Sequence, residues 1–518
     1  MAGWRALLCG IAMAAALLLL TRRIWLNVAF CLPLLLFQPV EWYAVHTYHS
    51  QVSPAMFAVF LLTNVGEASD FLAHLWPLIL GLYAAWIAVL AGVIWSLRRW
   101  RSELPLARRL AISGPLLVAA VASAVAADGL AGIRIHAAAA PFAGSAIRCG
   151  QMLSQRGEVE RLAAQRAGFR HEAASAREGE RQLVILVIGE SLRWGNLQIN
   201  GYARETTPRL SARDGVLSLG DVAACSHLTT LALPPALTGC SPDDHDGMLR
   251  RTSLVAACRE AGFATRWLSN QAPTGRWDEL VASYAHESEA VRWMNPAPLV
   301  SEWGRVQVYD DKLIDALASE LAGLPDRALI VLHMQGSHMR YELRYRPEEA
   351  VFLPAASQGS GEDYRQQPDR MRNAYDNSVV MTDRIIDACI DLHLRSGRTG
   401  FVMFVADHGE SLLDDARGFQ GHGCLPPPEV ELRVPWLAWP SPAEIAAHPA
   451  PWRSLAENRM RKASTRDLFQ TLLDLAGVRT RDSDPERSLA SPTYRERARA
   501  IIDSWQRPLD FDRDVLGR

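Results

Sequence analysis

The first quarter of the chain contains apolar stretches as long as a lipid bilayer is thick, and this limits the possible folds more than any other feature. Residues 74–95 carry no charged side chain, and a helix needs about 20 apolar residues to span a membrane. Three further candidate spans are residues 6–20, 24–45 and 110–127. We therefore predict an α-helical transmembrane bundle over residues 1–132. The alternatives are a signal peptide for the first stretch, or buried helices of a soluble protein.

The positions of the arginines indicate how these spans are oriented. Arginines occur in the loop between the first two spans and in the loop between the last two, whereas residues 46–73 contain neither Lys nor Arg. Loops rich in Lys and Arg stay in the cytoplasm. Residues 46–73 and the chain after residue 128 are therefore expected on the other side. In a bacterium this predicts a multi-pass inner-membrane protein with a periplasmic domain.

The remainder of the chain divides into a charged segment and a longer domain. Residues 133–181 are rich in Ala, Arg and Glu, which predicts helices along the membrane surface and a linker; an exposed charged helix without such a role is the alternative. The net charge of −2 gives no general attraction to nucleic acid, so we expect no nucleic-acid partner. In an oxidising compartment, Cys225 and Cys240 are the favoured disulfide pair because they bracket one short segment.

From residue 182 to residue 518, strand patterns and helix patterns alternate. Expected strands cover residues 183–189, 264–269, 328–336, 400–406 and 434–440. Expected helices cover residues 252–263, 312–324, 373–397 and 465–478. This βαβ rhythm predicts an α/β domain with a largely parallel central sheet. In such sheets the functional residues gather where the carboxyl ends of the strands meet the loops.

Polar side chains follow three of the expected strands. Glu190 ends the first strand, Asp407 and His408 follow the strand 400–406, and His338 follows the strand 328–336. Two carboxylates that meet would repel each other unless a cation or a proton lay between them. Two carboxylates with an imidazole suit a divalent metal, with zinc as the first choice and manganese as the second. A solvated loop position is the alternative for each residue taken alone.

A candidate nucleophile lies between these strands. Residues 221–240 bring a hydroxyl to the start of an apolar helical stretch, at Thr229 or Thr230. The N-terminus of a helix favours an anion, either an alkoxide or a phosphoryl oxygen. An ordinary helix-capping role is the alternative. Pro234 and Pro235 predict that this element is short or bent.

At this point the sequence resembles the phosphoethanolamine transferases of the alkaline phosphatase/sulfatase superfamily, over nearly its whole length. The similar segments, in family order, are "LLTNVGEASDFL" (61–72), "VIGESLRWGNLQINGYARETTPRL" (187–210), "SHLTTLALPPALT" (226–238), "HMQGSHMRYELRYRP" (333–347), "YDNSVVMTDRIID" (375–387) and "VADHGES" (405–411). "WLSNQ" (267–271) and "LFQTLLDLAGV" (468–478) are similar to the branch that modifies the lipopolysaccharide core rather than lipid A.

The resemblance implies a role for each matched residue. The register of the match selects Thr229 as the nucleophile. The implied zinc ligands are Glu190, Thr229, Asp407 and His408. The implied contacts to the phosphoryl group or the acceptor are His338 and His422. The implied contacts to the donor from the membrane side are Thr63, Asn64 and Glu67.

The resemblance also implies an activity. Phosphoethanolamine would pass from phosphatidylethanolamine to Thr229 at the zinc site, and from there to a sugar of lipopolysaccharide. The alternatives are a phosphoglycerol transferase, another phosphodiester transferase or hydrolase of the superfamily, and a lipid-binding sensor without turnover. A sulfatase would need a CxPxR or SxPxR segment, which "CSHLT" (225–229) does not provide.

Overall fold

The structure describes most of the chain after residue 165 and short pieces before it. In the computed structural model the described residues are 79–85, 87–88, 91–92, 95, 105, 111, 115, 166, 168–177, 179–271, 279–294, 300–301, 304–305, 308–357 and 364–518. Two of the expected spans, 6–20 and 24–45, lie outside these residues, and the other two are described only in part. Within the described part, no helix has the length and apolarity that crossing a bilayer requires. The boundaries at residues 132 and 181 stay predictions.

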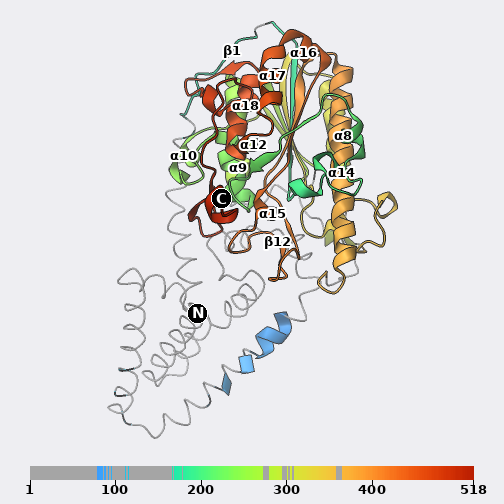
Figure 1. The fold of residues 1–518 in the computed structure, drawn as a ribbon, viewed down its shortest axis with the longest axis vertical. Helices are drawn as coiled ribbons and strands as arrows, with labels where there is room; N and C mark the ends of the chain where they lie inside the picture. The colour runs from blue at the N-terminus through green and yellow to red at the C-terminus, as the bar shows by residue number, and fades with distance from the viewer. Residues whose placement is uncertain are drawn as a thin grey trace. The chain divides into compact units, whose positions relative to one another are not determined.

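A seven-stranded mixed sheet forms the centre of the domain after residue 165 (Figure 1). Its strands, in spatial order, are β3 (Leu217–Ser218), β13 (Trp436–Pro440), β10 (Thr399–Ala406), β2 (Gln182–Gly189), β9 (Arg327–His333), β5 (Ala264–Ser269) and β6 (Ala290–Trp293). The five strands from β10 to β6 are parallel, whereas β13 runs antiparallel to both of its neighbours. The sheet is therefore largely parallel as predicted, with one reversed strand that the sequence pattern did not reveal.

The central strands are buried on both faces, which explains their continuous apolar sequences. Every residue of β2 is buried, and in β9 and β10 only the first residue is partly exposed. Such runs are typical of parallel strands covered by helices on both sides. At the start of β10, Gly400 has φ +112°, and a Cβ there would lie 2.0 Å from the carbonyl oxygen of Leu183. Only glycine allows β10 to approach β2 this closely at that position.

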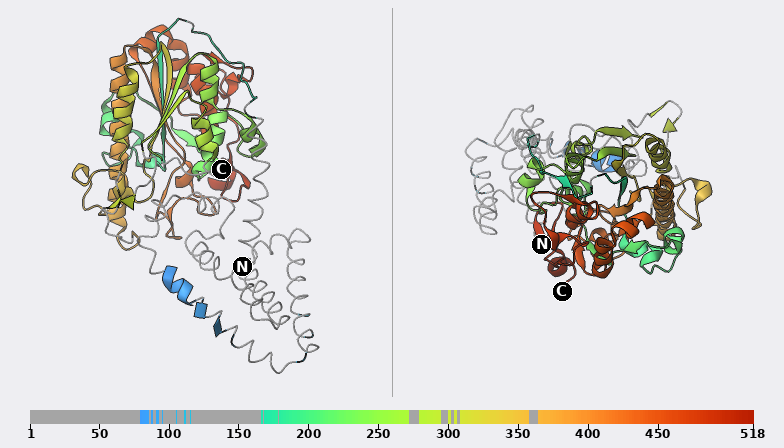
Figure 2. Two further views of the ribbon diagram at one scale, coloured as in Figure 1. Left: turned by 180° about the vertical axis from the view of Figure 1, so that it is seen from behind. Right: turned by 90° about the horizontal axis from the view of Figure 1, so that it is seen from above.

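Helices cover both faces of the sheet (Figure 2). One layer contains α8 (Pro208–Ala212), α13 (Asp311–Leu321) and α14 (Pro368–Ser396); the other contains α9 (Thr229–Thr238), α11 (Leu254–Glu260) and α18 (Leu468–Leu475). Helix α14 starts at a proline in its first turn and ends before Gly397, which has φ +63°, as helix-start and helix-stop preferences predict. It begins five residues before the predicted range 373–397.

The expected disulfide is wrong, and the expected shortening of α9 is not found. Cys225 and Cys240 do not form a disulfide; both are free and buried, as are the other three cysteines in the described part of the chain. Helix α9 is not cut short by Pro234 and Pro235, since it continues through both to Thr238. Proline has no amide hydrogen to donate. Each proline therefore removes only one hydrogen bond from α9.

Candidate functional site

The site begins where the two innermost strands end together. Strands β2 and β10 are parallel neighbours, and Gly189 pairs with Ala406 at the end of the ladder. The next residues, Glu190 and Asp407, therefore leave the sheet side by side. This register is the physical reason why residues more than two hundred positions apart meet at one edge.

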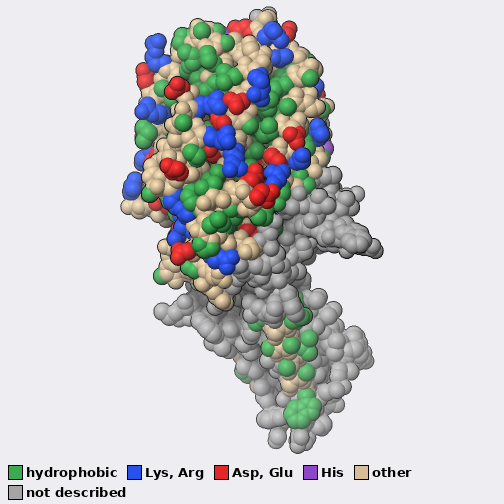
Figure 3. Space-filling model, turned by 90° about the vertical axis from the view of Figure 1, so that its right-hand side faces the viewer, with side chains coloured by type: hydrophobic (Ala, Val, Ile, Leu, Met, Phe, Trp, Pro, Cys, Tyr) green, Lys and Arg blue, Asp and Glu red, His purple; other side chains and the backbone are tan. Residues whose placement is uncertain are grey.

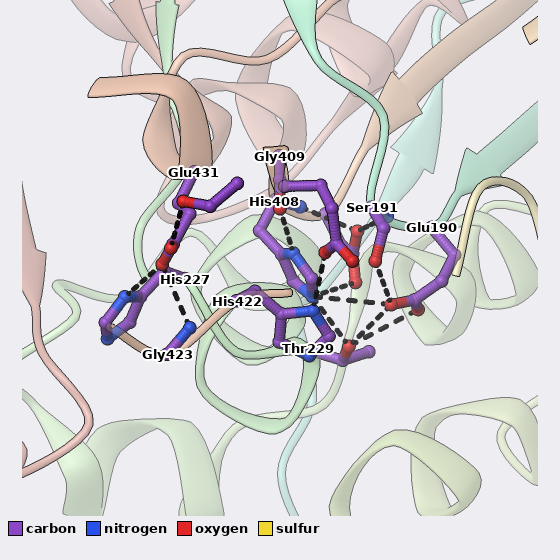
Figure 4. A network of polar contacts seen from close by, with 12 residues as sticks. Glu190, Ser191, His227, Thr229, His408, Gly409, His422, Gly423 and Glu431 are labelled. Carbon is purple, nitrogen blue, oxygen red and sulfur yellow. Dashed lines mark hydrogen bonds and ion pairs between the residues drawn. The ribbon is translucent and has the colours of Figure 1, made fainter. Parts of the chain in front are cut away.

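Three of the predicted ligand residues share a compact space with the hydroxyl of Thr229 (Figure 4). Thr229 Oγ1 lies 3.2 and 3.3 Å from the two carboxylate oxygens of Glu190 and 3.2 Å from Nε2 of His408. The same Nε2 lies 3.3 Å from Oε1 of Glu190 and 3.4 Å from Oδ2 of Asp407. Tetrahedral zinc, with bonds of about 2.0–2.1 Å, holds its ligand atoms about 3.3 Å apart. The spacing of these atoms fits such an ion.

The hydrogen bonds leave suitable lone pairs free at this point. Nδ1 of His408 lies 2.7 Å from the carbonyl oxygen of Gly409; a carbonyl can only accept, so Nδ1 carries the proton and Nε2 is available as a ligand. Oδ1 of Asp407 accepts from the amides of Ser191 and His408. Oδ2 of Asp407 is buried and accepts no hydrogen bond from the residues that the structure describes. An orphaned buried carboxylate oxygen is what a metal would satisfy.

Electrostatics at this edge favour a positive charge. Burial raises the pKa of Asp407 to about 8, and the adjacent Glu190 carboxylate adds to this rise. Burial opposes ionisation of His408 as well, yet Asp407 and Glu190 raise the pKa of His408 to about 10. The same pairing with His408 keeps the pKa of Glu190 below its usual range despite complete burial. These shifts mean that a proton on Asp407 and the charge of His408 would balance the two carboxylates, and a divalent metal would supply the positive charge in their place.

Thr229 is the first residue of α9 and is not its N-cap. The N-cap position belongs to Leu228, which makes no side-chain cap. The first helical amides to donate within the helix are those of Leu231 and Ala232, both to the Leu228 carbonyl. Within the described part of the chain, no hydrogen bond uses the amides of Thr229 and Thr230. The capping alternative therefore does not account for Thr229, and its hydroxyl points toward the candidate ligands.

The loop that carries His338 packs directly on the backbone of Glu190. The amide of Ser337 donates to the Glu190 carbonyl at 2.9 Å. Gly336 has φ +53°, and a Cβ there would lie 2.7 Å from the Glu190 amide nitrogen, so the position requires glycine. The buried carboxylate of Asp310 accepts from the amides of Gln335 and Gly336 at 2.9 Å each. Asn270, from the "WLSNQ" segment, also donates to Asp310.

His338 and His422 both lie at this edge, as their predicted role requires. Their ring centres are 5.7 Å apart, and the ring of His422 lies 4.2 Å from that of His408. Oε2 of Glu410 lies 2.8 Å from Nδ1 of His422, and Tyr341 donates to the other oxygen of Glu410 at 2.9 Å. Burial raises the pKa of Glu410 to about 8. Thr63, Asn64 and Glu67 lie outside the described residues.

A buried network behind the site ties its loops together, and sequence reasoning missed it. His227 is fully buried with Nδ1 2.9 Å from Glu431, while its Nε2 accepts from the amide of Ser504. Glu431 also accepts from Ser411 and from the amide of Gly423. The sequence "EVEL" gives no sign of such a role. His333 is buried at the end of β9.

Comparison with known proteins identifies similar families and structures. The family model described as Sulfatase matches residues 182–478. The phosphoethanolamine transferase EptC of Escherichia coli (strain K12) is 26% identical over 497 residues, which cover 90% of this chain and 83% of EptC. The phosphoethanolamine transferase EptA of the same strain is 29% identical over 312 residues, covering 59% of this chain and 55% of EptA.

Two solved structures are also similar. The C-terminal periplasmic domain of EptC from Escherichia coli in complex with Zn is 26% identical, with a TM-score of 0.59, and the match covers 67% of this chain and 98% of that domain. The integral membrane protein EptA from Neisseria meningitidis has a TM-score of 0.67 at 21% identity, over 89% of this chain and 87% of that protein. At this identity the second likeness shows the fold alone.

Proposed function

This chain belongs to the sulfatase family, and we propose that it is a phosphoethanolamine transferase that carries the group from phosphatidylethanolamine to a sugar of lipopolysaccharide. The observation that carries the proposal is the position of Thr229: its hydroxyl lies within 3.3 Å of Glu190 and His408 at the start of α9. A core sugar is the proposed acceptor, in line with the "WLSNQ" resemblance and with the longer match to EptC than to EptA.

We assign the metal to zinc, held by Glu190, Thr229, Asp407 and His408. The fit of their spacing to tetrahedral coordination and the Zn complex of the similar EptC domain support zinc over manganese. When bound, zinc would lower the pKa of the Thr229 hydroxyl and offset charge on the phosphoryl oxygens. The chain's own residues hold the reacting groups in place, which is the larger part of catalysis in phosphoryl transfer.

In the first step the oxygen of Thr229 forms a bond to the phosphorus of phosphatidylethanolamine. The Thr229 hydroxyl gives up its proton, the bond from phosphorus to the glycerol oxygen breaks, and that oxygen takes up a proton as diacylglycerol leaves, so the step releases no net proton. The amides of Thr229 and Thr230 at the start of α9 can donate to a phosphoryl oxygen. In the second step a sugar hydroxyl attacks the phosphorus and releases Thr229. Oε2 of Glu410 lies 2.8 Å from Nδ1 of His422. In the tautomer that carries its proton on Nδ1, Nε2 of His422 can take the proton of that hydroxyl.

Trapping the intermediate tests the proposal. The purified full chain is incubated with phosphatidylethanolamine labelled in its head group, digested, and analysed by mass spectrometry. The label should appear on the peptide that contains Thr229, and it should vanish with Thr229→Ala but persist with the neighbouring control Thr230→Ala. Label on the Thr229→Ala protein would reject the nucleophile. Phosphatidylglycerol in a parallel reaction tests the phosphoglycerol alternative.

Two further measurements separate the metal and the acceptor from the nucleophile. Glu190→Ala should lose zinc, measured by elemental mass spectrometry, while circular dichroism shows an intact fold; full zinc occupancy would show that the site is assigned wrongly. Mass spectrometry of lipopolysaccharide from cells with and without the gene should place the added phosphoethanolamine on the core rather than on lipid A.

A further inference from the structure

A short loop before α14 exposes apolar side chains although its backbone is firmly held. Leu353 is 70% exposed and Val351 is 55% exposed. The amides of Val351 and Phe352 both donate to Oδ1 of Asn377 at 2.8 Å, and Asn377 donates back to the Phe352 carbonyl. Asn373 donates to the carbonyl of Pro354. The exposure is thus a property of a fixed conformation.

This loop, residues 350–354, lies at the same edge of the sheet as Glu190 and Asp407. Helix α14 leads into β10, so its C-terminus is at the opposite edge and its N-terminus is at the edge that carries the site. Tyr375 on α14 contacts Ser191 next to Glu190, which places Tyr375 level with the site. Asn373 and Asn377, the two residues that hold the 350–354 loop, flank Tyr375 on the same helix.

Helix α14 also extends beyond the sheet at this edge. Its 29 residues span about 43 Å at 1.5 Å per residue, whereas the eight residues of β10 span about 26 Å. Since the C-terminus of α14 is tied to the start of β10, the helix extends about 17 Å past the end of that strand. The part before Tyr375, which is level with the site, projects about 10 Å beyond it. Figures 1 and 2 show the lower end of α14 and the loop beside it reaching beyond the strands.

The surroundings of the loop combine apolar, aromatic and cationic groups. The guanidinium of Arg204, which also forms an ion pair with Asp376 at 2.6 Å, lies over the ring of Phe352 at 4.1 Å. Arg370 donates two hydrogen bonds to the carbonyl of Ala355. Figure 3 shows this side of the domain, where charged side chains of both signs alternate with hydrophobic ones. Exposed aliphatic tips next to an aromatic ring and arginines are the composition that binds at a bilayer interface.

We propose that the 350–354 loop docks on a phospholipid surface, with Val351 and Leu353 entering the apolar boundary, and so turns the catalytic edge toward its lipid donor. The choice of a phospholipid surface as the partner of this loop rests on the proposed function, because a lipid donor must reach Thr229 from a membrane surface. A rigid loop at the mouth of the site needs no ordering on contact, so it can hold the edge at a fixed distance from that surface.

Photo-crosslinking tests the contact without any need for turnover. The photoreactive residue benzoylphenylalanine replaces Leu353 in the full chain, which is placed in vesicles of phosphatidylethanolamine and phosphatidylglycerol and irradiated. The matched control carries the same residue at Ile445, which is 42% exposed on α16 (Pro442–Ala447). Ser441 before this helix bonds Gly400 at the start of β10, so the control lies at the opposite edge.

Lipid adducts, measured by mass spectrometry, should be about tenfold more abundant at position 353 than at position 445. Equal yields, or adducts at position 353 with protein only, would overturn the proposal. Val351 is a second site for the photoreactive residue should the first variant misfold.

Steady-state kinetics of a second variant test the proposal independently. Leu353→Glu should raise KM for phosphatidylethanolamine in vesicles about tenfold, while turnover of a water-soluble ethanolamine phosphodiester stays unchanged. A loss of both activities would mean that the loop supports the site rather than the membrane contact. If the native chain transfers nothing but still crosslinks to lipid at position 353, the proposed function fails and the docking surface stands.

Discussion

The phenol oxygen of Tyr375 lies 2.8 Å from the carbonyl oxygen of Ser191, and this hydrogen bond ties helix α14 to the turn that carries the candidate metal ligands. Ser191 donates its amide to Oδ1 of Asp407 and its hydroxyl to Oε1 of Glu190. Its φ of +56° is unfavourable for a residue other than glycine. Such strain persists where the surroundings enforce it, and Tyr375 is one of the residues that enforce it.

Replacing Tyr375 with phenylalanine should therefore weaken metal binding. Tyr375→Phe removes the donor to Ser191 and the acceptor for the Arg193 amide, so both ligand carboxylates lose support. Mutation of a residue that orients metal ligands typically lowers metal affinity about 10–100-fold. A competition titration against a chelator should show a loss of zinc affinity in this range.

The matched control is Tyr284→Phe. Tyr284 is equally buried, and its hydroxyl donates to the Met248 carbonyl at 2.9 Å, away from the site. This variant should cost similar stability, about 1 kcal/mol, and leave zinc affinity unchanged. Equal effects of the two variants on zinc affinity would show that Tyr375 acts only through general stability.

The meeting of Glu190 and Asp407 could be predicted from the sequence because it depends on local patterns. Each residue follows a continuous apolar strand, and parallel strands end at a common edge. The prediction needed only the assumption that these strands are neighbours, and the parallel pairing of β2 with β10 confirms it. The reversal of β13 was not predictable, since a short apolar strand has the same pattern in either direction.

The supporting residues could not be predicted, because their partners depend on tertiary packing. Glu431 contacts His227, 204 positions earlier, and nothing in the alternation of apolar and polar residues encodes that distance. Tyr375 contacts Ser191, 184 positions earlier; the predicted helix 373–397 included Tyr375, but its helical pattern does not say which loop the side chain meets. Asp310 supports the His338 loop from the start of α13. Each of these residues resembles an ordinary helix or loop residue in the sequence.

Asp407→Asn should have opposite effects on the metal-free and the metal-loaded protein. Burial and the Glu190 carboxylate raise the pKa of Asp407 to about 8. Without a metal, Asp407 must therefore take up a proton on folding at neutral pH, which costs free energy of folding. The amide keeps an acceptor for the two backbone donors and needs no proton to be neutral. The melting temperature of the metal-free protein should rise, by about 2 °C for each kcal/mol gained.

The same variant should lose the stabilisation that zinc gives the native chain. Thermal unfolding with chelator and with added zinc measures both effects, and Asp414→Asn, a change at a partly exposed acid, is the control. A variant that is less stable than the native chain in chelator would contradict the conclusion that the raised pKa of Asp407 costs the metal-free fold stability.

Removing the carboxylate of Glu431 should destabilise the domain and loosen the loop that carries His422. Glu431→Ala leaves His227, Ser411 and the Gly423 amide without their buried partner. Unsatisfied buried donors cost about 1–3 kcal/mol each, so a loss of about 3 kcal/mol is expected in urea unfolding. Glu429→Ala is the control, because Glu429 is exposed and its ion pair with Arg433 contributes about 0–1 kcal/mol. A comparable loss in both variants would refute this role.

His393 should make the stability of the domain fall as the pH falls below about 6.5. The side chain is fully buried, its Nε2 donates to the Leu183 carbonyl at 2.8 Å, and burial lowers the pKa of His393 to about 4. The unfolded chain takes up a proton near pH 6.5 while the folded chain does not, so the stabilisation is present above that pH and is lost toward pH 4. Between pH 7 and pH 4.5 the titration of His393 should lower the free energy of unfolding by about 2–3 kcal/mol.

Urea unfolding in chelator, compared between the native chain and His393→Gln, isolates the effect because the other titrating groups are common to both. If the free energy of unfolding depends on pH in the same way in both proteins, His393 is not the source of the pH dependence.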